Sequence, residues 1–223
     1  MDRGALSSPS GIRIESDVYR RYLDVVYVAS SEMTPAYRKS VFDHLADSYA
    51  QLTTESLNLA IYHHIFATLQ SSDCPARWLD FGCGTGLGSS AFSEYSVDTP
   101  DVALLGYDVS TSMISRMSNN GTRKYAGIVV GDGENLPFAT GTFDATILVF
   151  VAHLLTEAAT NELFRVLKPG GTLAFNMFKP QSHRKPYRQL TRHDQVLSLQ
   201  EETARISSGF RRVQVRLVYL IKR

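Results

Sequence analysis

The sequence contains few of the features that mark several large classes of protein. Its 223 residues include two cysteines, Cys74 and Cys83, which stand too far apart and too alone to suggest a disulfide framework or a zinc site. We therefore expect reduced thiols and no metal site. No apolar run approaches the ~20 residues that a membrane-spanning helix needs. Residues 1–11 are polar and lack the apolar core of a secretion signal, so we expect a cytoplasmic protein with no membrane partner.

A large excess of charge is absent as well. The chain has 23 Lys and Arg against 22 Asp and Glu, a formal net charge of +1. Domains that bind nucleic acid by electrostatics alone are usually strongly basic, so nucleic acid is not the expected partner. One dense basic stretch, residues 183–193, leaves two interpretations open. It is either a clamp for a carboxylate, a phosphate or an RNA backbone, or a solvated surface loop.

Apolar patterning divides the chain into three regions. Residues 1–15 are expected to form a disordered tail, and residues 16–70 an N-terminal helical lid or substrate region. Within this lid, helices are predicted over about 16–29, from Pro35 to about Leu52, and over 55–69. The third region, residues 71–223, is the expected core of the protein.

The core region alternates short apolar runs with helical stretches. The runs at 78–81, 102–107, 127–130, 145–152 and 172–178 are predicted strands. This order is typical of an α/β, Rossmann-like, mostly parallel sheet with helices on both faces, whose ligands bind at the carboxyl ends of the strands. A further helix is predicted around 195–206. Residues 211–223 lack a turn signal, which favours one long strand or two very short ones, and so a truncated C-terminal β-hairpin.

The central motif is a glycine-rich loop, residues 82–88, between a predicted strand and a predicted helix. Alternating glycines let the backbone turn sharply and approach a ligand closely. A dinucleotide fingerprint would need glycine at 87 or 89, where Leu87 and Ser89 stand, and no Gly-Lys-Ser/Thr follows the loop. The pattern therefore excludes both the nicotinamide dinucleotide fingerprint and a phosphate-binding P-loop.

Asp-Phe-Gly-Cys-Gly-Thr-Gly at 80–86 resembles motif I of the class I S-adenosylmethionine-dependent methyltransferases, and the likeness is greatest to the broad group that includes the ubiquinone/menaquinone-type enzymes. The likeness covers about residues 41–178. The other segments that carry it are 42–49, 106–110 with Met113, 131–138, 143–153 and 162–171.

The resemblance implies S-adenosylmethionine as the cofactor and a set of residues that hold it. Asp108, at the end of the second predicted strand, would accept hydrogen bonds from the ribose diol; a helix cap made by Asp108 or Ser110 is the alternative. An acid in the segment 131–138 would meet the adenine amino group. The implied cofactor residues are Tyr49, Asp80, Gly82, Cys83, Gly84, Thr85, Gly86, Asp108, Val109, Met113, Asp132, Gly133, Glu134 and Val149.

Methyl transfer chiefly requires that the acceptor be aligned with the methyl group, and a base only where the acceptor must lose a proton. His153, at the end of the fourth predicted strand, and His183, after the fifth, are the candidate bases. Tyr37, Phe150 and Arg184 are candidates for contact with the acceptor. We expect a small-molecule acceptor methylated on oxygen, nitrogen or carbon. An RNA-modifying methyltransferase, or a cofactor-binding protein with a non-methylating or regulatory role, stays open, and no sequence feature indicates the oligomeric state.

Overall fold

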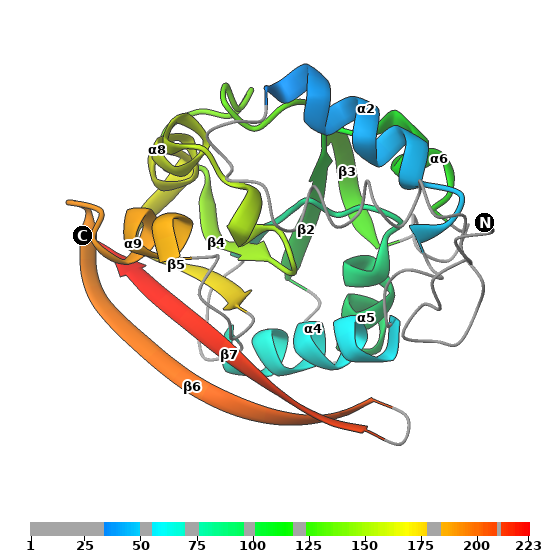
Figure 1. The fold of residues 1–223 in the computed structure, drawn as a ribbon. Coiled ribbons are helices and arrows are strands. Elements are labelled where there is room, and N and C mark those ends of the chain that lie inside the picture. The colour runs from blue at the N-terminus through cyan, green and yellow to red at the C-terminus, as the bar shows by residue number, and fades with distance from the viewer. Residues whose placement is uncertain are drawn as a thin grey trace, which may run out of the picture.

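The structure, a computed structural model, describes residues 34–49, 55–69, 76–95, 101–117, 124–177, 184–208 and 211–223. Its centre is a seven-stranded sheet with the order β3-β2-β1-β4-β5-β7-β6 (Figure 1). Strands β1 to β5 pair in parallel, and β7 is antiparallel to both β5 and β6. The predicted Rossmann-like sheet is confirmed. Its strands are β1 Ala76–Phe81, β2 Val102–Asp108, β3 Tyr125–Val130, β4 Phe143–Leu148, β5 Leu167–Met177, β6 Val196–Ser208 and β7 Arg211–Lys222.

Helices cover both faces of this sheet, as predicted. Helices α4 (Glu55–Leu69) and α5 (Leu87–Tyr95) pack on one face, whereas α8 (Glu157–Val166) and α9 (Arg184–Thr191) pack on the other (Figure 1). Neighbouring β1 residues point to opposite faces, so Trp78 joins the core under α4 and α5 while Leu79 joins the core under α8. In the described part of the chain, no helix is long and apolar enough to cross a membrane.

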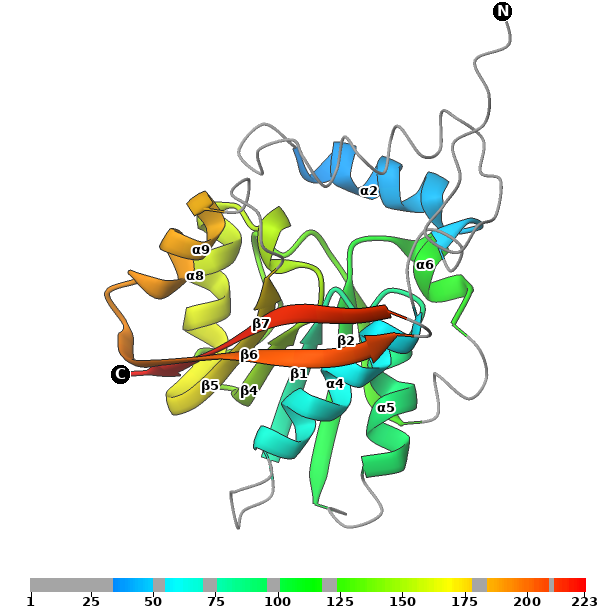
Figure 2. The same ribbon diagram turned by 60° about the horizontal axis from the view of Figure 1, so that its bottom comes forward.

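The carboxyl edge of the parallel strands is where the chain leaves regular structure for its predicted motifs. The glycine loop follows β1, Asp108 ends β2, and a turn at Phe150 follows β4 and leads into the short 3-10 helix η2 (Ala152–Leu154). Helix α2 (Pro35–Leu45) lies across this edge, near α6 (Thr111–Ser115), as Figure 2 shows. Helix α2, from the N-terminal region, therefore covers the edge of the sheet where ligands bind in such folds.

The predicted helix around 195–206 is wrong, because residues 196–208 form β6. Leu197 and Leu199 alternate with polar residues, a period of two that suits a strand, and β6 pairs with β7 from Val196 to Ser208. Since Ser208 pairs with Arg211, two residues connect the strands, and the hairpin is long rather than truncated. Beyond β5 the hairpin crosses α4, where His64 bonds Glu202 at 2.8 Å.

Other element boundaries differ from prediction by smaller amounts. Helix α4 has the predicted bounds, while α2 ends at Leu45 rather than near Leu52. The basic stretch 183–193, for which a ligand clamp and a surface loop were both open, contains α9, whose Pro186 and Leu190 are buried and whose Arg188 is exposed. The predicted tail, the predicted helix at 16–29 and the proposed boundary at 70/71 lie outside the described residues.

Candidate functional site

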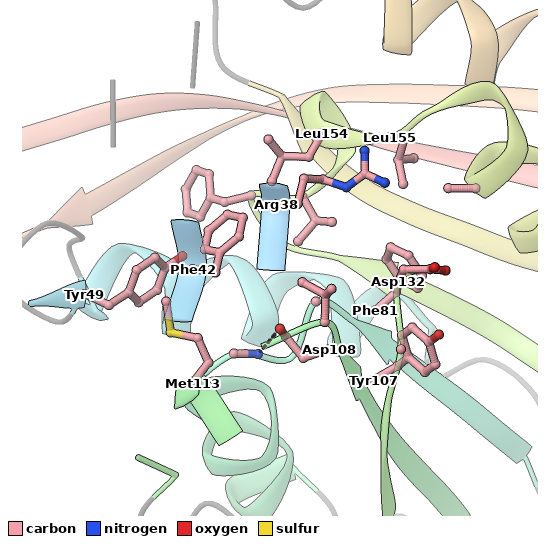
Figure 3. A pocket seen from close by; sticks show the side chains of 17 residues that line it. Arg38, Phe42, Tyr49, Phe81, Tyr107, Asp108, Met113, Asp132, Leu154 and Leu155 are labelled. Atoms are coloured by element: carbon pink, nitrogen blue, oxygen red, sulfur yellow. Dashed lines mark hydrogen bonds between the residues drawn. The ribbon is translucent and has the colours of Figure 1, made fainter. Parts of the chain in front are cut away.

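A pocket of about 700 Å³, counted with its open mouth, lies at the carboxyl edge of the sheet. In Figure 3, Phe42 and Tyr49 stand on one side, Phe81 and Tyr107 on the other, and Asp108 lies between them. The lining comes from α2 and the residues after it, the glycine loop, the end of β2, α6, the loop after β3, the turn after β4, η2 and the start of α8. It consists of Arg38, Phe42, Tyr49, Phe81, Gly82, Gly84, Tyr107, Asp108, Val109, Met113, Gly131, Asp132, Phe150, Val151, Leu154, Leu155 and Ala159.

The glycine loop forms one wall of the pocket and adopts a backbone shape that favours glycine. Gly82, Gly84 and Gly86 have φ angles of 80°, 52° and 89°. A Cβ built on Gly82 would lie 2.3 Å from Val151 Cγ2, so the Val151 side chain packs directly against the backbone of Gly82. A Cβ on Gly84 would meet nothing closer than the Gly82 carbonyl oxygen at 4.0 Å. The loop is thus tight against Val151 and open toward the pocket at Gly84.

Asp108 connects the glycine loop to the end of β2. Its carboxylate accepts the backbone N–H of Gly84 at 2.8 Å and that of Ser110, also at 2.8 Å. Burial raises the pKa of Asp108, and these backbone hydrogen bonds oppose that rise because they stabilise the charged form. The carboxylate is 9% exposed and faces the pocket. It is therefore held rigidly as an acceptor at the base of the pocket.

Asp80 lies behind the loop rather than in the pocket. It is fully buried, and its two oxygens accept the hydroxyls of Tyr62 at 2.9 Å and Tyr125 at 2.5 Å. Burial raises the pKa of Asp80 to about 7, against the lowering effect of the two tyrosine hydrogen bonds. A Cβ on Gly88, at the start of α5, would lie 2.1 Å from Asp80 Oδ2. Asp80 thus braces the loop from below.

Helix α2 is held over the pocket at one end by an ion pair. Arg38 Nη2 lies 2.6 Å from Glu134 Oε1, and the same oxygen accepts the Thr156 hydroxyl at 3.1 Å. The Arg38 side chain is 7% exposed, so the pair is largely shielded from water. Glu134, predicted to contact the cofactor, does not line the pocket and, through this ion pair, forms a latch between α2 and the loop after β3.

A second latch joins α2 to the start of α6. Asp43 Oδ1 accepts the hydroxyl of Ser110 at 2.6 Å and the backbone N–H of Ser112 at 3.1 Å, and the other carboxylate oxygen pairs with Lys39. Burial alone would raise the pKa of Asp43, but these hydrogen bonds outweigh it and lower the value to about 2. Because Ser110 also donates its N–H to Asp108, the lid helix is tied to the acceptor at the pocket base.

The structure brings part of the predicted site together around this pocket. Eight predicted residues line it, namely Tyr49, Gly82, Gly84, Asp108, Val109, Met113, Asp132 and Phe150. The other predicted cofactor residues lie in or next to the glycine loop, after β3 or after β4 and do not line the pocket, namely Asp80, Cys83, Thr85, Gly86, Gly133, Glu134 and Val149. Among the candidates for acceptor contact and catalysis, Tyr37 is exposed and His153 is half-buried in η2, and neither lines the pocket. His183 and the side chain of Arg184 lie outside the described residues.

Several lining residues were not predicted, above all Arg38 and the pair Leu154 and Leu155. In sequence, Arg38 is one polar position on an amphipathic helix, and nothing marks it as buried. Leu154 and Leu155 follow His153 directly, and their place near the end of a predicted strand was the available signal.

Known methyltransferases are similar to this chain in sequence over the region that contains the glycine loop, and in fold. Residues 79–175 match the family model of the methyltransferase domain. The chain is 32% identical over 145 residues to the ubiquinone/menaquinone biosynthesis C-methyltransferase of Haemophilus ducreyi, covering 60% of this chain and 54% of that enzyme. It is 30% identical over 148 residues to the tRNA (carboxymethyluridine(34)-5-O)-methyltransferase of Arabidopsis thaliana, covering 64% of this chain and 33% of that one.

The chain thus spans about half, or less, of the length of these two curated relatives. Among solved structures, a SAM-dependent methyltransferase from Thermotoga maritima has a TM-score of 0.58 and 16% identity, over 82% of this chain and 98% of that one. This likeness is one of fold.

Proposed function

We propose that the chain is a class I S-adenosylmethionine-dependent methyltransferase, of the group that includes the ubiquinone/menaquinone-type enzymes, and that it methylates a small-molecule acceptor on oxygen, nitrogen or carbon. One observation carries the proposal: the buried Asp108 carboxylate is fixed by the N–H of Gly84 at the base of a pocket. That arrangement places an acceptor for hydrogen bonds beside an open stretch of backbone, as a nucleoside requires.

The residues at the pocket base fit S-adenosylmethionine. The open space at Gly84 admits a ligand against the backbone, and Asp108 is placed to accept hydrogen bonds from the two ribose hydroxyls. We assign Val109 and Met113 to apolar contact with the adenosyl group, and Asp132 to its amino group. When bound, the cofactor supplies a methyl group already activated on a sulfonium sulfur. The predicted residues behind the loop, such as Asp80, would then support these contacts rather than make them.

The remaining lining suits alignment of an acceptor and exclusion of water. The apolar walls are formed by Phe42 on α2 and, facing it, by Phe150, Val151, Leu154 and Leu155. Holding a nucleophile in line and shielding it from water lowers the activation free energy of the reaction by several kcal/mol, without a change in its chemistry. We therefore propose that this chain contributes mainly orientation and a dry pocket.

A base is needed only for an acceptor that must lose a proton. His153 stays our candidate, since it lies in the chain between the lining residues Val151 and Leu154, and His183 is the second. His153→Ala separates the two cases: full turnover on the identified acceptor would leave orientation as the contribution of this chain.

The first test is calorimetric binding of S-adenosylmethionine, S-adenosylhomocysteine and NAD to the purified protein. We expect micromolar binding of the two sulfur nucleosides and none of NAD. A screen of quinols and other small metabolites for acceptor-dependent release of S-adenosylhomocysteine follows. Binding without turnover on any acceptor would favour a regulatory or non-methylating role, and absence of binding would refute the assignment of the pocket.

Replacement of Asp108 by alanine should weaken S-adenosylhomocysteine binding by about 10- to 100-fold. The variant loses hydrogen bonds to a charged acceptor, each worth ~1.5–3 kcal/mol. Asp101→Ala is the matched control, because Asp101 is exposed at the opposite end of β2. Calorimetry on both folded variants checks the expectation. Unchanged affinity in Asp108→Ala would remove Asp108 from the cofactor site.

The latch between α2 and the core should affect how firmly the cofactor is retained. Arg38→Met keeps the length of the side chain but breaks the ion pair with Glu134, and we expect a 3- to 10-fold faster release of S-adenosylhomocysteine in stopped-flow measurements, about 1 kcal/mol. Lys168→Met is the control, since it breaks the 2.7 Å pair with Asp144 elsewhere on the molecule. Equal release rates in the two variants would show that α2 does not retain the ligand.

RNA is the second candidate acceptor, favoured by one specific observation. The relative from Arabidopsis thaliana is named as a tRNA methyltransferase. In this chain Arg188 and Arg192 are exposed on and just after α9. Binding of tRNA that weakens steeply with salt would support this function, because contacts to phosphate release counterions. Weak, salt-insensitive binding would leave the small-molecule acceptor.

A further inference from the structure

The turn that follows β4 holds a strained residue at the pocket wall. Phe150 has a φ of 58°, and among the described residues it is the non-glycine residue with a positive φ. An aromatic side chain disfavours this left-handed conformation, which persists only where the surroundings impose it. Such outliers gather at functional sites, and Phe150 lines the pocket. The question is which group imposes the conformation.

Asn176 on β5 is the group that holds this turn. Its Oδ1 accepts the backbone N–H of Phe150 at 2.6 Å, a short bond between two neighbouring strands' ends. Asn176 is 3% exposed, and its Nδ2 has no hydrogen-bond partner within the described structure. A buried amide with an unpaired donor is costly, and a leucine of similar volume would avoid that cost. The side-chain oxygen therefore explains why an amide occupies this buried position: it restrains the strained turn at Phe150.

The held conformation determines two contacts of the pocket. It turns the chain out of β4 so that the side chain of Phe150 contributes to the wall. It also sets Val151 against Gly82, where a Cβ would come within 2.3 Å of Val151 Cγ2. The Val151 carbonyl then accepts the N–H of Leu154 at 2.8 Å and starts η2. A change at Phe150 would thus move the wall and the support of the glycine loop together.

We propose that Asn176 is a positioning residue: by holding Phe150 in the left-handed conformation, it sets the wall of the methyl-transfer pocket and presses Val151 onto the glycine loop. The proposal rests on the proposed function, since it assigns this pocket to S-adenosylmethionine and the acceptor. Asn176 does not line the pocket, and it acts through the backbone of Phe150.

The test measures the dissociation constant of S-adenosylhomocysteine by calorimetry in a double-mutant cycle. Asn176→Leu removes the acceptor and should weaken binding about tenfold. Asn176→Asp keeps an oxygen in the same place and should bind within about twofold of the parent. Phe150→Gly accepts the left-handed conformation without strain. In the Phe150→Gly background, Asn176→Leu should therefore weaken binding by less than about threefold.

The outcomes separate positioning from a merely structural role. A structural role predicts that Asn176→Leu lowers the thermal midpoint equally in both backgrounds and leaves the affinity of the folded protein unchanged; that result would overturn the proposal. If Asn176→Leu does not fold, equal affinities of Asn176→Ser and the parent would overturn it instead. Failure of the unmodified protein to bind S-adenosylhomocysteine would overturn the proposed function and this inference together. That result comes from the unmodified protein alone, so it is distinguishable from a result that only the Asn176 variants give.

Discussion

Gly82→Ala should abolish most of the cofactor binding, with an affinity for S-adenosylhomocysteine about 100-fold below that of the parent, or about 2.7 kcal/mol. Two effects act on the same atom. Gly82 has a φ of 80°, which costs a residue with a Cβ ~1–2 kcal/mol, and the new Cβ would lie 2.3 Å from Val151 Cγ2. The loop must then move away from Val151, and it carries the Gly84 N–H away from Asp108.

Two further variants isolate the cause of this loss. Gly170→Ala shares the positive φ, 76°, but its Cβ would meet nothing within 4 Å, so it should leave binding unchanged. Val151→Ala in the Gly82→Ala background removes the clash and should raise the affinity about tenfold above that of Gly82→Ala. The rest of the loss should remain, because the positive φ of residue 82 is still strained. Calorimetry on the three proteins provides the comparison. Parent-like binding by Gly82→Ala would mean that the glycine loop does not hold the cofactor.

The glycine loop was predictable because its geometry is local. The φ angles at Gly82, Gly84 and Gly86 are required by a turn that seven consecutive residues define. Helix α4 was predictable for the same reason, since its buried residues Leu57, Ile61 and Ile65 recur at helical spacing. Where neighbours in sequence determine the structure, prediction and structure agree closely.

The C-terminal hairpin was missed because its stability comes from pairing at a distance. The helix around 195–206 was predicted because the resembled family has a helix before its C-terminal hairpin, and residues such as Gln200, Glu201, Glu202 and Ala204 favour a helix by propensity. Pairing with β7 along the whole strand, and burial of Ile206 against the α4 side of the sheet, override that propensity. The alternation of Leu197 and Leu199 with polar residues was the local signal for a strand, but the pairing that stabilises it comes from β7, after the turn.

The parts of the site that act through long-range contacts were equally hidden. Arg38 bonds Glu134, 96 residues away in the sequence, and Phe150 bonds Asn176, 26 residues away. Each of these residues has an ordinary sequence environment, and its role follows from a burial and a partner that the fold supplies. Asp80 was predicted to bind the cofactor, yet the two tyrosines that satisfy it come from α4 and β3.

Removal of both tyrosine hydroxyls around Asp80 should cost about 3–5 kcal/mol of unfolding free energy at pH 8, because a buried carboxylate would lose its partners. The pKa of Asp80, about 7 in the folded protein, lies above the ~3.9 of an unfolded chain. The folded state therefore binds the proton that the unfolded state releases, and stability falls as pH rises from about 4 to 7. Tyr62→Phe/Tyr125→Phe would extend that fall above pH 7, because the lost hydrogen bonds favour the charged form.

The loss of unfolding free energy in the double variant should therefore depend on pH. At pH 5 Asp80 is protonated in both proteins, and the loss should shrink to about 1–2 kcal/mol, typical of a neutral buried group. Urea unfolding at pH 5 and pH 8 measures the difference, and Tyr95→Phe is the control, since its buried hydroxyl has no partner among the described residues. Equal losses at the two pH values would show that the tyrosine hydroxyls stabilise the fold through hydrogen bonds that do not depend on the charge of Asp80.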